Sequence, residues 1–367
     1  MNNQYISDVT TAMTQIDKNI VDIGIKRERG TPPTQASSEF ITNKQQGDWA
    51  EKTLMHAFNN ASKDYISVKY GLDIELVAGD PGFNEFYEKY QDELDTIGKK
   101  PDLLIFHKKD YKKEWGLNIS DMNADELDKI VPLAVCGIEV RSSSFLDKKY
   151  NDHSKKVFDD SKEKALAMKQ LILSKHGTLL SEKSSSIYQI ISLMDDSNIH
   201  QTSFRSPSWK KSPDEIELSK QLKTLNSFLQ NLKKRDFLSI TPKVEDLKVV
   251  YNWILRYGVP HFYVQVFFDS AFGIGFLDIL RLVSDKSKQG VDYFVESGDA
   301  KNQNKTTIKI NSRLCTQVLD NVIMPKHSSQ SKEVGDRGRL LFYVNFEYSK
   351  ADVLGSNLNQ LINQKLI

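Results

Sequence analysis

The sequence predicts an α/β protein with a mixed central sheet flanked by helices. Two kinds of segment, which alternate along the chain, lead to this prediction. Segments rich in β-branched and aromatic residues are typical of strands and occur at 65–78, 103–106, 133–142, 186–194 and 261–269. Segments with apolar residues at helical spacing occur at 45–59, 83–97, 156–173 and 214–234. The 367 residues, 39% of them hydrophobic, are enough to bury a substantial core.

The first part of the chain is expected to contribute a polar arm and then the first helix. Residues 1–44 are polar, and the Pro, Gly and Ser content of 27–40 is typical of an irregular segment. In the helix predicted at 45–59, Trp49, Leu54 and Phe58 recur at helical spacing. The charged segment 107–131 is interpreted as an insertion between two strands.

The second half of the chain is expected to mix helices, short strands and loops. Residues 195–215 are predicted to form a loop, and Thr241-Pro242 is a helix-start signal. Gly273 and Gly275 lack the strand-loop-helix context of a nucleotide-binding loop, so we expect turn residues there. Short strands and loops then continue to about Tyr348, without an internal repeat or a clean linker.

Composition excludes several classes of protein. The 50 basic and 49 acidic side chains give a net charge of +1, which excludes a uniformly basic coat but allows local basic patches. Cys136 and Cys315 are too few for a disulfide framework or a structural zinc site, so we expect reduced thiols. The sequence begins without a signal-peptide pattern, and no apolar run approaches the length of a membrane span. We expect a soluble, cytoplasmic protein without membrane contact.

Two charged residues stand on the strand predicted at 133–142. Because side chains alternate along a strand, Glu139 and Arg141 share one face of it. Asp102 precedes the strand at 103–106, and pairing of the two strands would bring Asp102 and Glu139 together. Two such carboxylates form an oxygen-rich site of the kind that binds Mg²⁺, and Arg141 would lie beside the metal. On these residues alone, a structural ion pair is the alternative.

These residues resemble the signature of the PD-(D/E)xK nuclease superfamily, with Pro101-Asp102 as its first half and Glu139-Val140-Arg141 as its second. A third carboxylate, Glu51 in GDWAEKTL, borders the apolar stripe of the helix predicted at 45–59 and so faces the domain. Three longer blocks, covering most of residues 30–280, resemble type II restriction endonucleases of the AccI type. They read PPTQASSEFITNKQQGDWAEKTL, GIEVRSSSFLDKKY and TPKVEDLKVVYNWILRYGVPHFYVQVFFDSAFGIGF.

The resemblance implies a restriction-endonuclease-like core that cleaves double-stranded DNA. The expected reaction is hydrolysis of phosphodiester bonds within a short symmetric site, leaving 5'-phosphates. The resemblance implies that Asp102, Glu139 and the Val140 carbonyl hold Mg²⁺, and that Glu51 contributes directly or through water. A symmetric site implies a two-fold homodimer, and a type II enzyme implies a prokaryotic restriction-modification system.

The same resemblance suggests a division of the chain by role. Residues 1–44 are the polar arm, 45–195 with 236–280 the nuclease core, and 196–235 with 281–367 an insertion and C-terminal region for DNA recognition and dimerisation. A single intertwined domain is the alternative. Candidate DNA-binding residues are Arg27, Arg29, Ser142, Ser143, Trp209, Lys210 and Lys211.

Arg141 departs from the superfamily pattern, which usually ends in lysine. A guanidinium stays protonated and cannot act as a general base, so a catalytic Arg141 would act electrostatically. It could orient the attacking water or stabilise the transition state. Alternatively, Lys100, Lys148 or Lys149 could supply the usual lysine.

Two polar residues of the strand at 261–269 have structural explanations beside functional ones. His261 could be a base, but a lone histidine at a strand start is more often structural. Asp269 could approach the site, but a turn or helix-capping role is the commoner one for its position.

Two other functions stay compatible with the sequence. A repair or junction-resolving nuclease of the same superfamily would share the core and cut by DNA structure. A catalytically inactive DNA-binding module would retain DNA binding, and Arg141 is the residue that keeps this alternative open.

Overall fold

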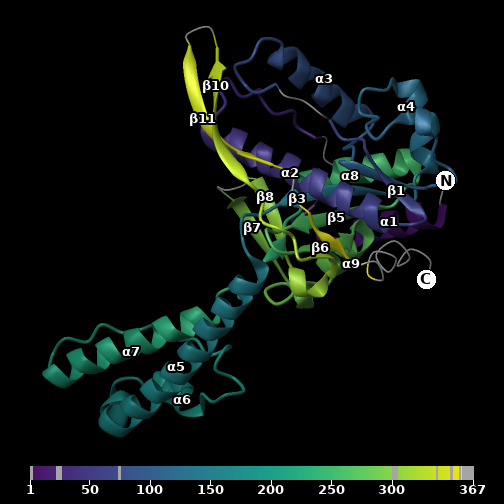
Figure 1. Cartoon of the computed structure of the whole chain (residues 1–367). Coiled ribbons are helices and arrows are strands. Elements are labelled where there is room, and N and C mark those ends of the chain that lie inside the picture. Colours follow the sequence, from purple (N-terminus) through teal and green to yellow (C-terminus); the bar gives the residue numbers. More distant parts are fainter. Residues whose placement is uncertain are drawn as a thin grey trace. The chain divides into compact units, whose positions relative to one another are not determined.

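The chain folds into two compact units (Figure 1). The computed structural model describes residues 3–21, 27–72, 76–299, 305–335, 338–347, 350–354 and 357. The first unit comprises Met1–Asp147 and Ser239–Ile367, and we call it the core unit. The second comprises Lys148–Leu238, and we call it the helical unit. The sequence predicts an insertion that starts at residue 196, whereas the helical unit starts at Lys148.

The described helices and strands alternate along the chain. The helices are α1 (Asn3–Gln15), α2 (Ser38–Ala61), α3 (Phe83–Thr96), α4 (Ala124–Ile130), α5 (Asp147–Lys183), α6 (Ser185–Leu193), α7 (Pro213–Leu232), α8 (Val244–Tyr257) and α9 (Phe276–Ser284). The strands are β1 (Tyr65–Lys69), β2 (Leu103–His107), β3 (Cys136–Ser142), β4 (Ser239–Ile240), β5 (His261–Val266), β6 (Ala271–Gly275), β7 (Tyr293–Asp299), β8 (Lys305–Asn311), β9 (Thr316–Asp320), β10 (His327–Val334), β11 (Arg339–Phe346) and β12 (Asp352–Val353). Short 3-10 helices lie at Lys113–Trp115, Val131–Leu133, Lys286–Lys288 and Ser312–Leu314.

A seven-stranded mixed sheet forms the centre of the core unit, in the order β1-β2-β3-β5-β6-β9-β12. Only the central pair, β3 and β5, is parallel among the neighbours in this order. A parallel pair needs a long crossover connection, and here the chain between β3 and β5 forms the helical unit, β4 and α8. Helices flank the sheet, so the predicted α/β fold is confirmed.

Apolar side chains cover both faces of this sheet, and strand alternation decides which face each one joins. On one face, Trp49 and Phe58 of α2 pack against Leu103 and Ile138. On the other face, Leu104, Phe106 and Tyr263 join α1, α8 and α9 in a second cluster (Figure 1). Each large apolar side chain buried in this way contributes about 1.5–3 kcal/mol to stability. Burial on both faces explains why the second strand reads as an unbroken apolar run.

The N-terminal segment is part of the core unit's apolar packing, and the interpretation as a polar arm does not hold for it. Residues 3–15 form the helix α1, and Val9, Ala12 and Met13 are almost fully buried in the cluster that includes α8 and α9. Besides these three residues, α1 adds the half-buried Tyr5 to the cluster, and the polar majority of the segment concealed the helix in the sequence. The irregular segment predicted at 27–40 ends early, because α2 already begins at Ser38 with Ser37 as its N-cap.

The strand predicted at 186–194 is wrong, because these residues form the helix α6. Ser184 caps the helix by accepting a hydrogen bond from the Ile187 backbone N–H. Isoleucines gave the segment its strand-like composition, but Ile191 is buried against other helices of the helical unit. Tertiary packing therefore decided the structure of a short apolar run that local preference left ambiguous.

Three other predicted elements differ in detail. The first strand ends at Lys69, and positions 73–75 of the segment 65–78 lie outside the described residues. Gly273 and Gly275 lie within β6 rather than in a turn, because this strand pairs with β5 and leads directly into α9. The helix announced by Thr241-Pro242 starts at Val244.

Candidate active site

Asp102 lies at the entrance of β2, opposite the centre of β3. The antiparallel register pairs Leu103 with Ile138, so Asp102 comes next to Glu139 and Val140. Its Oδ2 accepts a hydrogen bond of 2.6 Å from the Val140 backbone N–H. The two halves of the sequence signature are therefore neighbours, as the sequence predicted.

A glycine allows the chain to approach Asp102 from β1. The backbone N–H groups of Tyr70 and Gly71 both donate to the Asp102 carbonyl, at 2.9 and 3.0 Å. A Cβ on Gly71 would lie 2.8 Å from the Asp102 Cα and 3.2 Å from its Oδ1. Any side chain at position 71 would therefore displace the aspartate.

Glu139 and Arg141 share one face of β3, as the alternation predicted. The parallel neighbour β5 places Tyr263 beside Glu139 and Gln265 beside Arg141. Glu139 is only 3% exposed, whereas a quarter of the Arg141 side chain is accessible. Nη2 of Arg141 lies 2.9 Å from Oε1 of Glu139.

Two residues that the sequence did not single out complete a charge network of Lys99, Glu139, Arg141 and Asp246. Nζ of Lys99 lies 2.7 Å from Oε1 of Glu139 and 2.8 Å from Oδ2 of Asp246. The same Oδ2 lies 2.9 Å from Nη2 of Arg141. Two cations and two carboxylates thus alternate around one point on the β3 face that α8 covers.

Lys99 is held against α8 by its backbone. Its N–H donates to the Val249 carbonyl at 2.9 Å. The preceding Gly98 has a φ of +95°, and a Cβ there would lie 2.3 Å from the same carbonyl oxygen. The sequence signal was a glycine-lysine pair three residues before Asp102, whereas Asp246 lies 105 positions after Arg141 and gave no local signal.

Opposing effects set the pKa values in this network. Burial would raise the pKa of Glu139, but Lys99 and Arg141 outweigh it and the pKa is lowered. Burial likewise opposes ionisation of Asp246, and the same two cations lower the pKa of its carboxyl. Burial and Arg141 disfavour the charge on Lys99, but Asp246 and Glu139 prevail and raise its pKa. All four side chains therefore remain charged at neutral pH.

The negative charges of Glu51, on α2, and of Asp102 are less well balanced by neighbouring cations than those of Glu139 and Asp246. Burial is the main cause that raises the pKa of Glu51 to about 7, and Asp48 and Glu139 add to it. Nζ of Lys69, 3.7 Å from Glu51, lowers this pKa only in part. Burial, Glu139 and Glu51 raise the pKa of Asp102 well above its usual value. These carboxylates repel one another and favour a bound cation.

The donor set fits a hard divalent cation. Oε2 of Glu139 is buried and has no hydrogen-bond partner, although its other oxygen accepts from Lys99. Mg²⁺ binds through one or two carboxylates and keeps several waters, so two carboxylates placed as Asp102 and Glu139 are would be enough protein ligands for it. Within the described ranges, no group of three or more His, Cys, Asp or Glu side chains forms a complete metal site.

The alternative lysines and the two polar residues of the 261–269 segment occupy other places. Nζ of Lys100 pairs with Glu93 at 2.7 Å, and Lys148 and Lys149 lie in the helical unit. His261 is fully buried among aromatic rings, and burial lowers its pKa to about 3. Oδ1 of Asp269 accepts from the Asp147 N–H at the start of α5, which is the capping role expected for it.

The arginines suggested for DNA binding lie against the acidic face of α3. Arg27 pairs with Asp95 at 3.0 Å, and Arg29 pairs with Asp92 and Asp95 at 2.8 and 2.7 Å. Contact with DNA phosphates would compete with these ion pairs.

The other residues suggested for DNA binding fall in two places. Ser142 ends β3, and the N–H of Ser143 donates to the Val266 carbonyl. Trp209 is half-buried in the helical unit, with its backbone N–H bonded to Ser219, while Lys210 and Lys211 are exposed beside it.

Comparison with known proteins identifies the family of the chain. The AccI restriction endonuclease family matches residues 4–365, almost the whole chain. No curated protein and no solved structure matched the chain. Among the described residues, no helix is long and apolar enough to cross a membrane. The chain therefore belongs to the AccI restriction endonuclease family and is a type II site-specific deoxyribonuclease.

Proposed function

We propose that this endonuclease hydrolyses one phosphodiester bond in each strand of a short symmetric DNA site, uses Mg²⁺ and leaves 5'-phosphates. The carrying observation is the pairing of Asp102 with the Glu139 strand, next to the buried and unpartnered Oε2 of Glu139. Two carboxylates on adjacent strands, with a third on a helix, suit a divalent cation that also receives phosphate oxygens.

Asp102, Glu139 and the Val140 carbonyl would hold the Mg²⁺ ion, with Glu51 directly or through water. When bound, the ion supplies the Lewis acidity that in-line hydrolysis of a phosphodiester requires. Burial and the repulsion between neighbouring carboxylates raise the pKa values of Glu51 and Asp102, and a cation there would relieve the repulsion.

Arg141 would stabilise the negative charge that develops on the phosphoryl group. Its Nη2 is engaged by Glu139 and Asp246, which fixes the guanidinium, while its Nε has no hydrogen-bond partner. A preorganised donor of this kind acts without reorganising during the reaction. Lys99 stays protonated between its two carboxylates, so neither cation would serve as a general base.

Recognition of a symmetric site would require a two-fold homodimer in which each protomer cuts one strand. Such an enzyme would act on DNA in the cytoplasm of a prokaryote as part of a restriction-modification system. The family match supports this setting.

Digestion of a phage DNA tests the proposal. The expected result is a reproducible ladder of discrete fragments in Mg²⁺, whose ends carry 5'-phosphates and can be ligated, and no cutting in excess EDTA. Cutting only at branched or damaged DNA would instead support a structure-specific nuclease. Binding without any cutting in Mg²⁺ would support an inactive DNA-binding module.

A further inference from the structure

The helical unit has a net positive charge that the near-zero net charge of the whole chain does not show. Residues 148–238 contain 17 lysines and arginines but only 11 aspartates and glutamates, a formal charge of +6. Because the whole chain has a charge of +1, the core unit has a charge of −5. A near-neutral composition therefore hides one basic unit and one acidic unit.

Acidic side chains of the helical unit form ion pairs with lysines of the same unit. Lys162 pairs with Asp196 at 3.0 Å and Lys175 with Glu217 at 2.6 Å. Lys183 pairs with Glu215 at 2.5 Å. These pairs join lysines of α5 to acidic residues at the start of α7 and before it. They help to hold together α5 and α7, which lie side by side in Figure 1.

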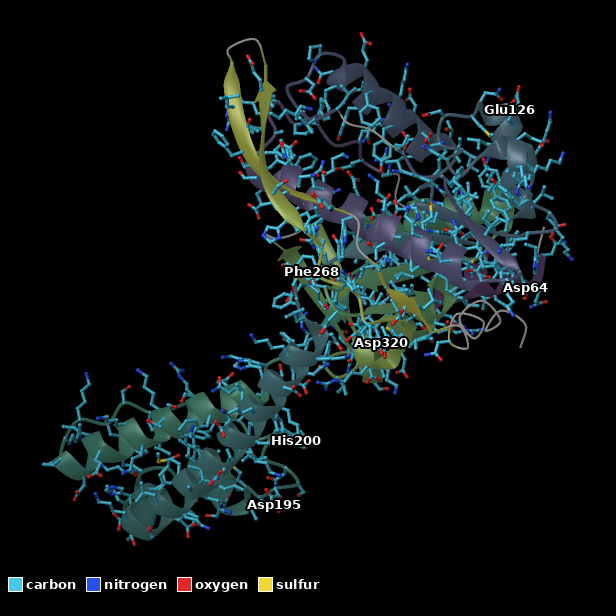
Figure 2. All side chains as sticks on the ribbon, in the orientation of Figure 1. Asp64, Glu126, Asp195, His200, Phe268 and Asp320 are labelled. Carbon is cyan, nitrogen blue, oxygen red and sulfur yellow. The ribbon has the colours of Figure 1, made fainter. Side chains whose placement is uncertain are left out.

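The rest of α7 and the segment before it contain basic residues without acidic ones. No aspartate or glutamate occurs from Ser197 to Pro213 or from Leu218 to Arg235. Figure 2 labels Asp195, which lies just before the first of these segments, and His200, which lies within it. The basic residues in the two segments are Arg205, Lys210, Lys211, Lys220, Lys223, Lys233, Lys234 and Arg235. None of them forms an ion pair in the described structure.

Helix geometry arranges part of this charge in a line. The leucines of α7 at 218, 222, 225, 229 and 232 are buried against α5 and α6. On the opposite side of α7, Lys220 and Lys223 are exposed, together with Ser227 and Gln230, and the exposed Lys234 follows two residues after the helix ends. The spacing of three or four residues from Lys220 to Gln230 makes one solvent-facing row, about 15 Å long at 1.5 Å per residue, and Lys234 lies just beyond its end. We call Lys220, Lys223 and Lys234 the α7 lysine row.

We propose that the α7 lysine row binds the phosphate backbone of the double-stranded DNA substrate, with Arg205, Lys210 and Lys211 beside it. This inference rests on the proposed function, because it names a second contact for the same DNA. A row of unpaired cations without interleaved acids complements a duplex, which carries one negative charge per about 1.7 Å of its axis. Such contacts position the enzyme on any sequence rather than read bases.

The test compares two triple variants with equal loss of charge. The first, K220Q/K223Q/K234Q, removes the α7 lysine row, and glutamine keeps the helix preference of lysine. The control, K155Q/K156Q/K164Q, removes three exposed lysines of α5 that are interleaved with Asp152, Asp159, Asp160 and Glu163. Binding of a short duplex is measured in EDTA over a range of salt concentrations, and unchanged circular dichroism and Tm establish folding.

Loss of the α7 lysine row should weaken binding at least tenfold near physiological salt and reduce the salt slope by about 2 to 3, for specific and unrelated duplexes alike. The control should bind within about threefold of the parent. Parental affinity in the first variant, or equal losses in both, would overturn the proposal. Because binding is measured without cleavage, failure of the parent to cut DNA in Mg²⁺ would refute the proposed function separately.

Discussion

At the scale of single residues, the charge network explains why two charges stand side by side on a buried strand. Glu139 holds one oxygen between Lys99 and Arg141 and leaves the other unpartnered. Asp246 binds both cations from the other side. Removing one partner of such a buried network costs about 3–5 kcal/mol, so each member also contributes to the fold. The functional and the structural interpretations of the pair therefore describe the same contacts.

Arg141 and Lys99 should differ in their effect on cleavage. Arg141→Ala should slow single-turnover cleavage by roughly 10²–10³-fold while DNA affinity stays within about threefold, because a preorganised charge is lost. Arg141→Lys should keep part of the rate, since charge remains without the planar fork. Lys99→Ala should reduce the cleavage rate less than Arg141→Ala does. A larger loss for Lys99→Ala would make Lys99 the main catalytic cation.

Gly98 should be sensitive to substitution, because Lys99 depends on its conformation. Gly98→Ala should destabilise the protein by at least about 2 kcal/mol, through the positive φ and the close Val249 carbonyl. The matched control is Gly47→Ala within α2, where a Cβ meets nothing within 4 Å. That change should stabilise by about 0.5–1 kcal/mol. Equal urea midpoints for the two variants would contradict the account.

At the scale of elements, α2 brings a carboxylate to the site at a cost in stability. The pKa of Glu51 rises from an ordinary 4.5 to about 7, so the folded state binds its proton more tightly than the unfolded state. Stability from this group is present at low pH and is lost as pH rises from about 4.5 to about 7. At pH 8 in EDTA, Glu51→Gln should therefore have a higher Tm than the parent and a free energy of unfolding larger by up to about 3 kcal/mol. The same variant should cleave DNA more slowly in Mg²⁺.

The pH dependence provides the control for this prediction. The difference in Tm between parent and Glu51→Gln should be smaller at pH 5 and approach zero only below about pH 4, where Glu51 is protonated in the folded and the unfolded state. Glu39→Gln, on the exposed start of the same helix, should behave alike at pH 5 and pH 8. Equal melting of parent and Glu51→Gln at pH 8 would show that the glutamate is well solvated.

Elements differed in how well the sequence predicted them. The strands with Leu103 and Ile138 were evident because both faces of the sheet bury them, and Asp102 and Glu139 followed from their pairing. The helix α6 was missed because its isoleucines favour strands when no neighbour is known. Lys99 and Asp246 were missed because a salt bridge between distant segments depends on the path of α8, which local patterns do not specify.

At the scale of the whole molecule, the charge is divided between the two units, and the composition alone did not reveal this. The sequence predicts the DNA-reading insertion at 196–235, whereas the compact unit also includes α5 and α6. The long helix α5 was predicted only at 156–173, because its N-terminal end is polar and its C-terminal end adds only Leu179 and Leu180 to the apolar cluster. Residues 148–195 therefore belong with the basic insertion and not with the sheet.

The molecule should act on DNA as a two-fold dimer, since a symmetric site presents two equivalent half-sites. Sedimentation of Asp102→Asn on a short specific duplex should show two chains per duplex. An unrelated duplex of the same length should not show this fixed stoichiometry. A single chain on the specific duplex would contradict a symmetric assembly.

The most direct test of the account is cleavage by Asp102→Asn, measured in Mg²⁺ together with its Tm in EDTA. Asparagine keeps an acceptor for the Val140 N–H but removes the charge whose burial raises the pKa of Asp102. We expect DNA binding to persist, cleavage to fall below detection, and the Tm to equal or exceed that of the parent. Cleavage at the parental rate by Asp102→Asn, or by the parent in excess EDTA, would contradict a metal site built on Asp102 and Glu139.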